Sequence, residues 1–442
     1  MSFFRCLFQT LRPVFLIGIV VVVSACGGGG GSASPPFVPA DSFRAIVVSS
    51  GTIHAGGTDH PYQLLRLEVT GKDPSFAQWM PQPGAAQAPA VMLTDPYGHI
   101  VWNGDLPPSS LDLIRSPEDV FNDAFVYLIN GFSVLNVFGR FYTEGNIQND
   151  VDDMVAGLQY LGRHEGVMQD RIAVSGGSWG GFEALWAAAN APQSAVPRVG
   201  VALFPVSDFE DLMNYVVNDI PATIVDPDKR FQYFNFFAPY VQRINGTAQA
   251  EGYGRWTRSY LLANLQTDFL VVHDQWDTLI PFGHSWNLAA ESVGRVQGLW
   301  FFKGSEADLN DLPFGYAHGD LQARDSLGTP FSFPVSLTLS LAYLLKGIAL
   351  SDQVIFNGFD PDALAAFVQY LKTYKDGGVD MEWAAPRLLD LADDRVRLIN
   401  MDTANDVRFG DAETARILNE VWGTALDEDN VRSALAAGLP PY

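Results

Sequence analysis

Basic residues are scarce in this chain of 442 residues, which has 27 Lys and Arg against 50 Asp and Glu and a formal net charge of −23. The sequence contains no basic patch, so nucleic-acid binding is not expected. It also lacks a Cys/His cluster, a His-Glu-x-x-His motif and a phosphate-binding loop. We therefore expect neither a metal ion nor any other cofactor.

Cysteine is limited to two residues, so no disulfide framework is expected. One of them, Cys6, lies in residues 1–25, where arginines precede an apolar stretch over residues 14–23. That stretch is too short to span a bilayer and is typical of a signal peptide. The other, Cys26, ends the run Val-Ser-Ala-Cys, which resembles a bacterial lipobox.

These features predict a lipoprotein signal peptide over residues 1–25, which is removed, and a lipid anchor on Cys26. Residues 26–41 are rich in Gly, Ser and Pro and would form a tether between the lipid and a catalytic domain. The expected location is the bacterial cell envelope, with the membrane and its face left open. The alternative is an ordinary secretory signal followed by an incidental cysteine.

A nucleophile elbow is the most informative motif present. The apolar run Ile172–Val174 predicts a strand, Gly-Gly-Ser-Trp-Gly follows it, and an Ala-rich segment from Phe182 predicts a helix. Gly-x-Ser-x-Gly between a strand and a helix places a serine hydroxyl at the tip of a sharp turn. Ser178 is thus the predicted nucleophile, and the backbone N–H of Trp179 at the helix start is a predicted oxyanion donor.

An acid and a histidine follow Ser178 in the order expected for a catalytic triad. Asp277 comes shortly after an apolar strand over residues 269–272, at the strand end where α/β sheets place functional groups. Asp274 is the alternative acid, although its carboxylate would also suit a turn cap. His318 lies beyond both and is flanked by glycine, whereas His273 lies inside the strand and indicates a packed core histidine.

The segments around these residues resemble the catalytic domain of the prolyl oligopeptidase family. They are the elbow run from Asp170 to Gly181, the His273…Asp277…Pro281 segment, the Ala317-His318-Gly319 run and Asp150-Val-Asp-Asp before a helix. The similarity covers about residues 85 to 350. It implies an α/β-hydrolase that acts as a serine peptidase or a related esterase.

The second oxyanion donor is expected from the loop after an early strand. Residues 90–94 predict that strand, and Pro96-Tyr97 follows it. This pair resembles the loop of the prolyl oligopeptidase and cocaine-esterase-like clans, which implies that the Tyr97 hydroxyl is a donor. The alternative is a Pro-Tyr-Gly turn with Tyr97 on the surface.

The remaining pattern predicts an α/β fold with a mostly parallel, doubly wound sheet. We expect the hydrolase domain over residues 42–350, with a helical cap inserted at about residues 208–267. Residues 351–442 are predicted to be a helical extension, with helices near residues 360–371, 412–421 and 430–437.

The sequence therefore predicts a membrane-anchored extracytoplasmic serine hydrolase, most simply a peptidase acting on a peptide or a small molecule. A carboxylic ester hydrolase on the same scaffold is the first alternative, because both reactions pass through an acyl-enzyme. A non-catalytic ligand-binding lipoprotein is the second. Glu183 and Glu210 are candidates for gripping a substrate amino terminus. The sequence does not indicate an oligomeric state.

Overall fold

The computed structural model describes residues 43–96, 98–100, 113–140, 146–219, 227–232, 238–274, 277–301, 318, 340–341, 343–350, 354–356, 397–400, 406–408, 412, 415–416, 419, 424–431 and 433–434. The chain divides into two units, Met1–Phe37 and Val38–Tyr442, and every described residue lies in the second. Cys26 and Tyr97 lie outside the described residues, as does the whole of the predicted tether.

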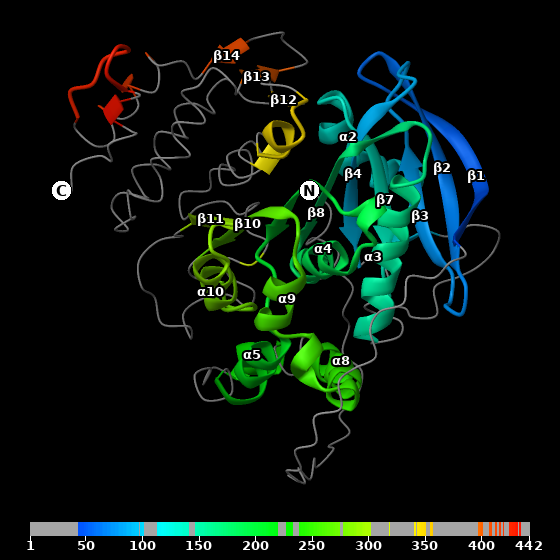
Figure 1. Ribbon diagram of the computed structural model, residues 1–442, viewed down its shortest axis with the longest axis vertical. Helices are drawn as coiled ribbons and strands as arrows, with labels where there is room; N and C mark the ends of the chain where they lie inside the picture. The colour runs from blue at the N-terminus through cyan, green and yellow to red at the C-terminus, as the bar shows by residue number, and fades with distance from the viewer. Residues whose placement is uncertain are drawn as a thin grey trace. The chain divides into compact units, whose positions relative to one another are not determined.

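A nine-stranded sheet forms the centre of the second unit (Figure 1). Its order is β1-β2-β3-β7-β4-β8-β9-β10-β11. The parallel strands are β7 (Ser133–Phe138), β4 (Ala88–Asp95), β8 (Val167–Gly177), β9 (Val199–Leu203), β10 (Asp268–Asp274) and β11 (Val296–Phe301). The first three strands are antiparallel: β1 (Phe43–Ala55), β2 (Thr58–Val69) and β3 (Ser75–Met80). The predicted mostly parallel α/β fold is confirmed.

Helices cover the parallel strands. Every residue of β4 and of β7 is buried, on both faces, as parallel strands between helix layers require. The helices that pack on these strands are α2 (Pro117–Ile129), α3 (Ile147–Leu161) and α4 (Trp179–Asn190), and α10 (Gly283–Glu291) packs on β10 and β11. Ser116 starts α2 with a capping box to Asp119, and Asn146 caps α3. The sequence thus marks both helix starts.

The predicted cap segment is helical between β9 and β10. It contains α5 (Phe209–Asn214), the π-helix η2 (Tyr215–Asp219), α7 (Pro227–Gln232), α8 (Ala238–Glu251), the short η4 (Tyr253–Arg255) and α9 (Arg258–Asn264). Figure 1 shows α5 and α8 away from the strands, at the lower end of the view. The boundaries of the cap and of the other predicted domains remain predictions.

The region beyond residue 351 contains strands that the sequence did not indicate. β12 (Val354–Phe356) pairs in parallel with β13 (Arg397–Asn400), which pairs antiparallel with β14 (Asp406–Arg408). Runs of three or four residues are too short to show the alternation that identifies a strand. Helical residues occur within the predicted helices 412–421 and 430–437, whereas the predicted helix 360–371 lies outside the described residues.

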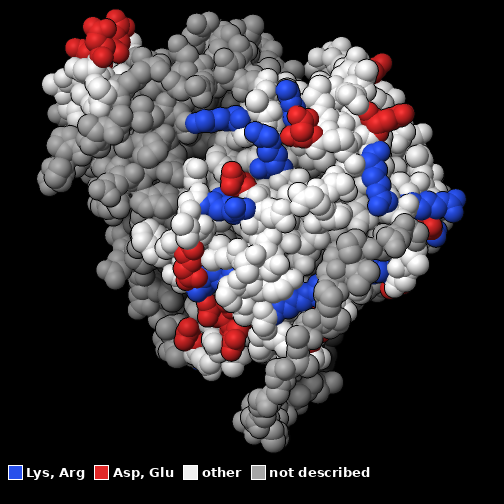
Figure 2. Space-filling model, in the orientation of Figure 1, with Lys and Arg blue, Asp and Glu red and all other residues white. Residues whose placement is uncertain are grey.

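Charge is dispersed over the face that Figure 2 shows, where the described Lys and Arg lie among Asp and Glu. Two of the closer ion pairs are Arg115 with Asp95 at 2.6 Å and Arg258 with Glu291 at 3.0 Å.

A separate short sheet pairs β5 (Gly98–Ile100) with β6 (Leu113–Arg115). Among the described residues, no helix combines the length and the apolar character needed to cross a membrane.

Asp208 joins the two ends of the cap, which predicts a measurable effect on stability. Its Oδ1 accepts the backbone N–H of Glu210 and of Asp211, and its Oδ2 accepts the N–H of Arg258 at 3.0 Å. We expect Asp208→Ala to lower the free energy of unfolding in urea by about 1–2 kcal/mol, because a helix cap and a second contact are lost. Asp208→Asn keeps an N-cap oxygen and should cost less. Equal losses for both variants would contradict this assignment.

Candidate active site

Ser178 lies between β8 and α4 in a backbone conformation that few side chains adopt. Its φ is +57° and its ψ −123°. The turn is held on both sides: the Ser178 N–H donates to the carbonyl of Leu203 at 2.9 Å, and the Ser178 carbonyl accepts the N–H of Phe182 at 3.1 Å. A positive φ in a non-glycine residue costs free energy and persists only where the surroundings impose it. Here β9 and the first turn of α4 impose it.

The glycines of the motif are required because β4, β8 and α4 approach each other closely. A Cβ added at Gly180 would lie 2.8 Å from the carbonyl oxygen of Thr94, and one at Gly176 would overlap the Thr94 hydroxyl. That hydroxyl donates to the Gly180 carbonyl at 2.7 Å. Any side chain at these positions would push the helix away from the strand, and the serine would lose its position.

A continuous chain of hydrogen bonds joins three distant residues at the carboxyl ends of the strands. Ser178 Oγ lies 2.8 Å from His318 Nε2, and His318 Nδ1 lies 2.8 Å from Asp277 Oδ2. His318 and Asp277 are both buried. Hydrogen on Nδ1 is fixed by the carboxylate, which leaves Nε2 to accept the serine proton. The structure therefore brings together the serine, the acid and the histidine that were predicted from the sequence. Asp274, the alternative acid, is the last residue of β10.

Phe204 supports the imidazole of His318. It directly follows β9, and its ring packs edge-on against His318 with 4.9 Å between centroids and 67° between planes. Its φ is +38°, which is again unusual for a residue with a side chain. This role could not be predicted from the sequence, because a phenylalanine after a buried strand is ordinary core composition.

Asp277 accepts four hydrogen bonds in a buried loop. Oδ1 accepts the N–H of Leu279 at 2.8 Å and of Ile280 at 3.0 Å, and Oδ2 is contacted by His318 and by His273 Nε2 at 3.1 Å. Burial by itself raises the pKa of this carboxyl group. The charge of His318 and the hydrogen bonds from His273 and His318 outweigh burial and hold its pKa well below 3.8. Asp277 is therefore ionised at neutral pH.

His273 is more than the packed core histidine that its apolar strand indicated. It is fully buried, and besides Asp277 its ring contacts the Ile280 carbonyl at 3.0 Å and Ser285 Oγ at 2.8 Å. Its separation of four residues from Asp277 was the only sequence signal for such a contact.

Trp179 contributes its backbone and its side chain to different tasks. As the first residue of α4 it has one of the N–H groups that a helix does not bond internally, at the positive end of the helix dipole. Its indole N–H donates to Asp150 Oδ2 at 2.9 Å, and its ring stacks on Phe182 at 4.4 Å between centroids. The indole is buried at 4% exposure, so only the backbone can serve an oxyanion. The hydroxyl role of Tyr97 stays a prediction.

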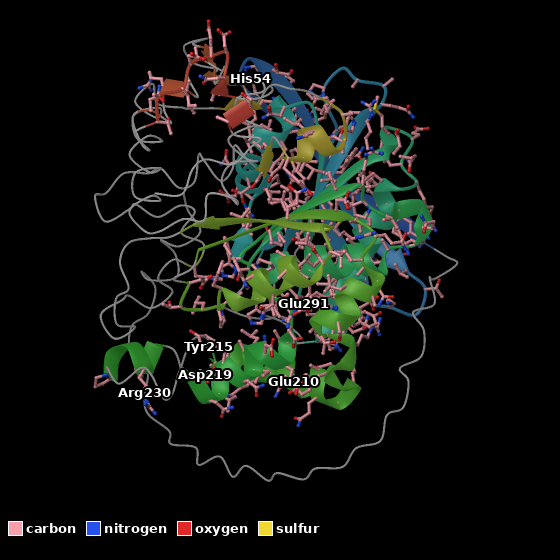
Figure 3. All side chains as sticks on the ribbon, turned by 60° about the vertical axis from the view of Figure 1, so that its left-hand side comes forward. His54, Glu210, Tyr215, Asp219, Arg230 and Glu291 are labelled. Atoms are coloured by element: carbon pink, nitrogen blue, oxygen red, sulfur yellow. The ribbon has the colours of Figure 1, made fainter. Side chains whose placement is uncertain are left out.

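The two carboxylates proposed to grip an amino terminus occupy different surroundings. Glu183 lies on α4 with 0% exposure, and among the described residues neither of its oxygens has a hydrogen-bond partner. Burial, with the nearby charges of Asp150, Asp153 and Asp95, raises its pKa well above 4.5. A neutral, enclosed acid does not suit ammonium binding. Glu210 is exposed on α5 of the cap (Figure 3).

Among the described residues, a hydrogen bond joins the cap to the acid loop. The Tyr215 hydroxyl, on η2, donates to the carbonyl of Thr278 at 3.0 Å. Burial first, and then the charges of Asp277 and Asp219, raise the pKa of Tyr215, so that it stays a donor. Figure 3 shows Tyr215, Asp219 and Glu210 together in the lower part of the view. Within the part of the chain that the structure describes, no group of three or more His, Cys, Asp or Glu residues could hold a metal ion.

Residues 138–298 match the sequence model of the prolyl oligopeptidase family. The matched segment contains the elbow, β9, the cap and β10 but not His318. No curated protein matches the chain. Solved structures that resemble it include a puromycin hydrolase (17% identity, TM-score 0.45, covering 66% of this chain and 40% of that one). Another is dipeptidyl peptidase 4 of Porphyromonas gingivalis (16%, 0.38, 55% and 32%). A third is a thermophilic carboxylesterase cloned from a metagenomic library (18%, 0.44, 69% and 91%).

This chain thus spans 40% of the length of the puromycin hydrolase. The similarity to the prolyl oligopeptidase family is thus limited to the sequence match over residues 138–298.

The buried acid at Glu183 predicts a stability that depends on pH. The pKa of Glu183 in the folded state is raised above 4.5. Its contribution to the free energy of unfolding is therefore fully present below pH 4.5 and is lost as the pH rises. Glu183→Gln removes this dependence while keeping the shape. We expect the variant to become more stable relative to the unchanged protein between pH 5 and pH 8, by up to about 1.4 kcal/mol per pH unit, in urea unfolding.

Glu165→Gln is the matched control, because Glu165 is exposed and its carboxylate stays solvated in both states. This control should leave the pH slope unchanged. A Glu183→Gln variant whose slope equals that of the unchanged protein would show that Glu183 is ionised in the folded state.

Proposed function

Residues 138–298 of this chain form a prolyl oligopeptidase family domain, and from that premise we propose that the protein is a serine hydrolase that cleaves peptide amide bonds. The observation that carries the proposal is the hydrogen-bonded series Ser178–His318–Asp277, with 2.8 Å at each step. The family domain supports a peptide or small-molecule substrate. The strained serine backbone supports it further, because such strain is concentrated at functional sites.

The reaction begins when Ser178 Oγ attacks the substrate carbonyl carbon while His318 Nε2 takes the hydroxyl proton. The carbonyl oxygen becomes an oxyanion, which the Trp179 N–H and the Tyr97 hydroxyl would stabilise. Ionised Asp277 holds the imidazole in the required tautomer and stabilises the imidazolium. His318 then returns the proton to the leaving amine as the carbon–nitrogen bond breaks. Water hydrolyses the acyl-enzyme in the same two steps, and Ser178 is regenerated.

We also propose that the enzyme works at the bacterial cell envelope, attached through a lipid on Cys26. The support is the sequence alone: a short apolar segment, the lipobox-like run that ends at Cys26 and a Gly/Ser/Pro tether after it. Such a tether would hold the catalytic domain clear of the lipid surface.

Ser178→Ala tests the nucleophile. The variant should fold and lose all labelling by a fluorophosphonate probe, because no hydroxyl remains to attack phosphorus.

Aminoacyl and prolyl anilides, assayed beside chromogenic acyl esters, test the substrate class. We expect the unchanged protein to cleave the anilides, and Ser178→Ala to reduce that turnover by at least about 10⁴-fold. Turnover of the esters alone would replace the peptidase assignment with an esterase, and continued labelling of Ser178→Ala would end the nucleophile assignment.

Cys26→Ser tests the anchor. The variant should appear in the soluble fraction after cell lysis, because one lipid-modified residue provides the membrane attachment. Cys6→Ser is the matched control and should remain with the membranes, since Cys6 lies in the segment that is removed. Retention of Cys26→Ser in the membrane fraction would contradict the lipid assignment.

A further inference from the structure

Asp277 lies between two imidazoles, only one of which belongs to the proposed triad. His318 Nδ1 and His273 Nε2 both approach Oδ2, at 2.8 Å and 3.1 Å. Oδ1 is occupied by two backbone N–H groups of the same loop. A carboxylate with contacts on both oxygens and no side-chain exposure has little freedom to rotate. His273 is therefore part of what fixes the direction in which Asp277 faces His318.

The atoms around His273 determine which of its nitrogens carries hydrogen. Nε2 faces the Asp277 carboxylate and the Ile280 carbonyl, which are both acceptors, so Nε2 must be the donor. Nδ1 faces the hydroxyl of Ser285 at 2.8 Å. In the neutral ring Nδ1 has a lone pair, and the Ser285 hydroxyl donates to it. The two acceptors at Nε2 thus select the tautomer that donates to Asp277, and the Ser285 hydroxyl completes the hydrogen bonding of the ring at Nδ1.

His273 and Ser285 are both held rigidly. They lie on β10 and on the first turn of α10, and both are 0% exposed. The ring of Phe282 stands perpendicular to the His273 imidazole at 5.9 Å between centroids. The start of α10 is in turn tied to the loop after β9, because Ser207 Oγ donates to the His284 carbonyl at 2.7 Å. The contact between His273 and Asp277 is therefore imposed by packing of the surrounding elements.

We propose that His273, whose ring is held at Nδ1 by Ser285, is a positioning residue that orients Asp277 for catalysis by His318 and Ser178. The proposal rests on the proposed function. His273 exchanges no proton with the substrate. Its Nε2–H holds Oδ2 in place, so that the negative charge of Asp277 faces the imidazolium that forms on His318. The effect is on the rate of the chemical steps, because neither His273 nor Ser285 reaches the substrate.

The experiment compares His273→Leu, which removes the donor, with His273→Gln, whose amide N–H can replace Nε2–H. We expect His273→Leu to lower kcat by about a hundredfold with KM changed less than about threefold, because a small displacement of an orienting group costs rate. His273→Gln should recover at least about tenfold of that loss. His60→Phe is the matched control: His60 is a buried histidine on β2 among the rings of Phe121 and Phe125, and its variant should keep kcat.

Ser285→Ala provides a second test that does not depend on the folding of His273→Leu. Alone it should lower kcat by about threefold to tenfold, because the His273 ring loses the contact that holds it at Nδ1 and is placed less exactly. In the His273→Leu background it should have no further effect, since Ser285 acts through His273. Additive losses would show that Ser285 has only a packing role and would overturn the relay.

The outcomes separate this inference from the proposed function. An unchanged kcat in both His273→Leu and Ser285→Ala, with Ser178→Ala inactive, would overturn the positioning role and leave the serine hydrolase intact. A protein that is labelled by the fluorophosphonate probe after Ser178→Ala would remove the proposed function instead. A parallel rise of KM in His273→Leu and His273→Gln would mean that His273 shapes substrate binding, which also contradicts the proposal.

Discussion

The close approach of β4, β8 and α4 is the constraint on which the rest of this site depends. Two glycines allow the strand and helix backbones to meet, and the Thr94 hydroxyl joins them at the Gly180 carbonyl. Ser178 lies between these two glycines and is held at a positive φ. Strain of this kind costs of order 1–3 kcal/mol and persists because the buried sheet over-determines the turn. The serine hydroxyl therefore has its position before any substrate arrives.

Polar groups at the site are arranged so that charge is concentrated in one carboxylate. Asp277 is buried, but the charge of His318 and the hydrogen bonds from His273 and His318 make its ionisation favourable despite the low dielectric. Glu183 shows the opposite result in a similar depth of burial. It has no hydrogen-bond partner among the described residues and has other acids nearby, so its neutral form is favoured. Burial raises the pKa of both acids, and the charge and hydrogen bonds of the neighbouring histidines lower it again at Asp277 alone.

Much of the fold and part of the site could be predicted from the sequence, for identifiable reasons. The elbow, the buried strands β4 and β10 and the order of Ser178, Asp277 and His318 all have local signatures in composition and spacing. The His273–Ser285 contact has none, because a histidine in an apolar strand indicates packing, and the place of Ser285 depends on how α10 docks. Glu183 was misjudged for the same reason. Helical periodicity does not say which neighbours enclose a side chain, and burial removes its proposed role.

The members of the proposed triad are supported by different parts of the fold, and this has a consequence for the cap. Ser178 depends on the sheet and on α4, of which all residues but one are buried. Asp277 depends on a loop whose Thr278 carbonyl accepts the hydroxyl of Tyr215 from η2. The cap thus contacts the loop of the acid, whereas the hydrogen bonds that hold the Ser178 backbone come from Leu203 and Phe182. His273 holds the same loop from the sheet side at Asp277 and at the Ile280 carbonyl. The geometry of the acid thus reflects a balance between cap and sheet, whereas that of the serine reflects the sheet alone.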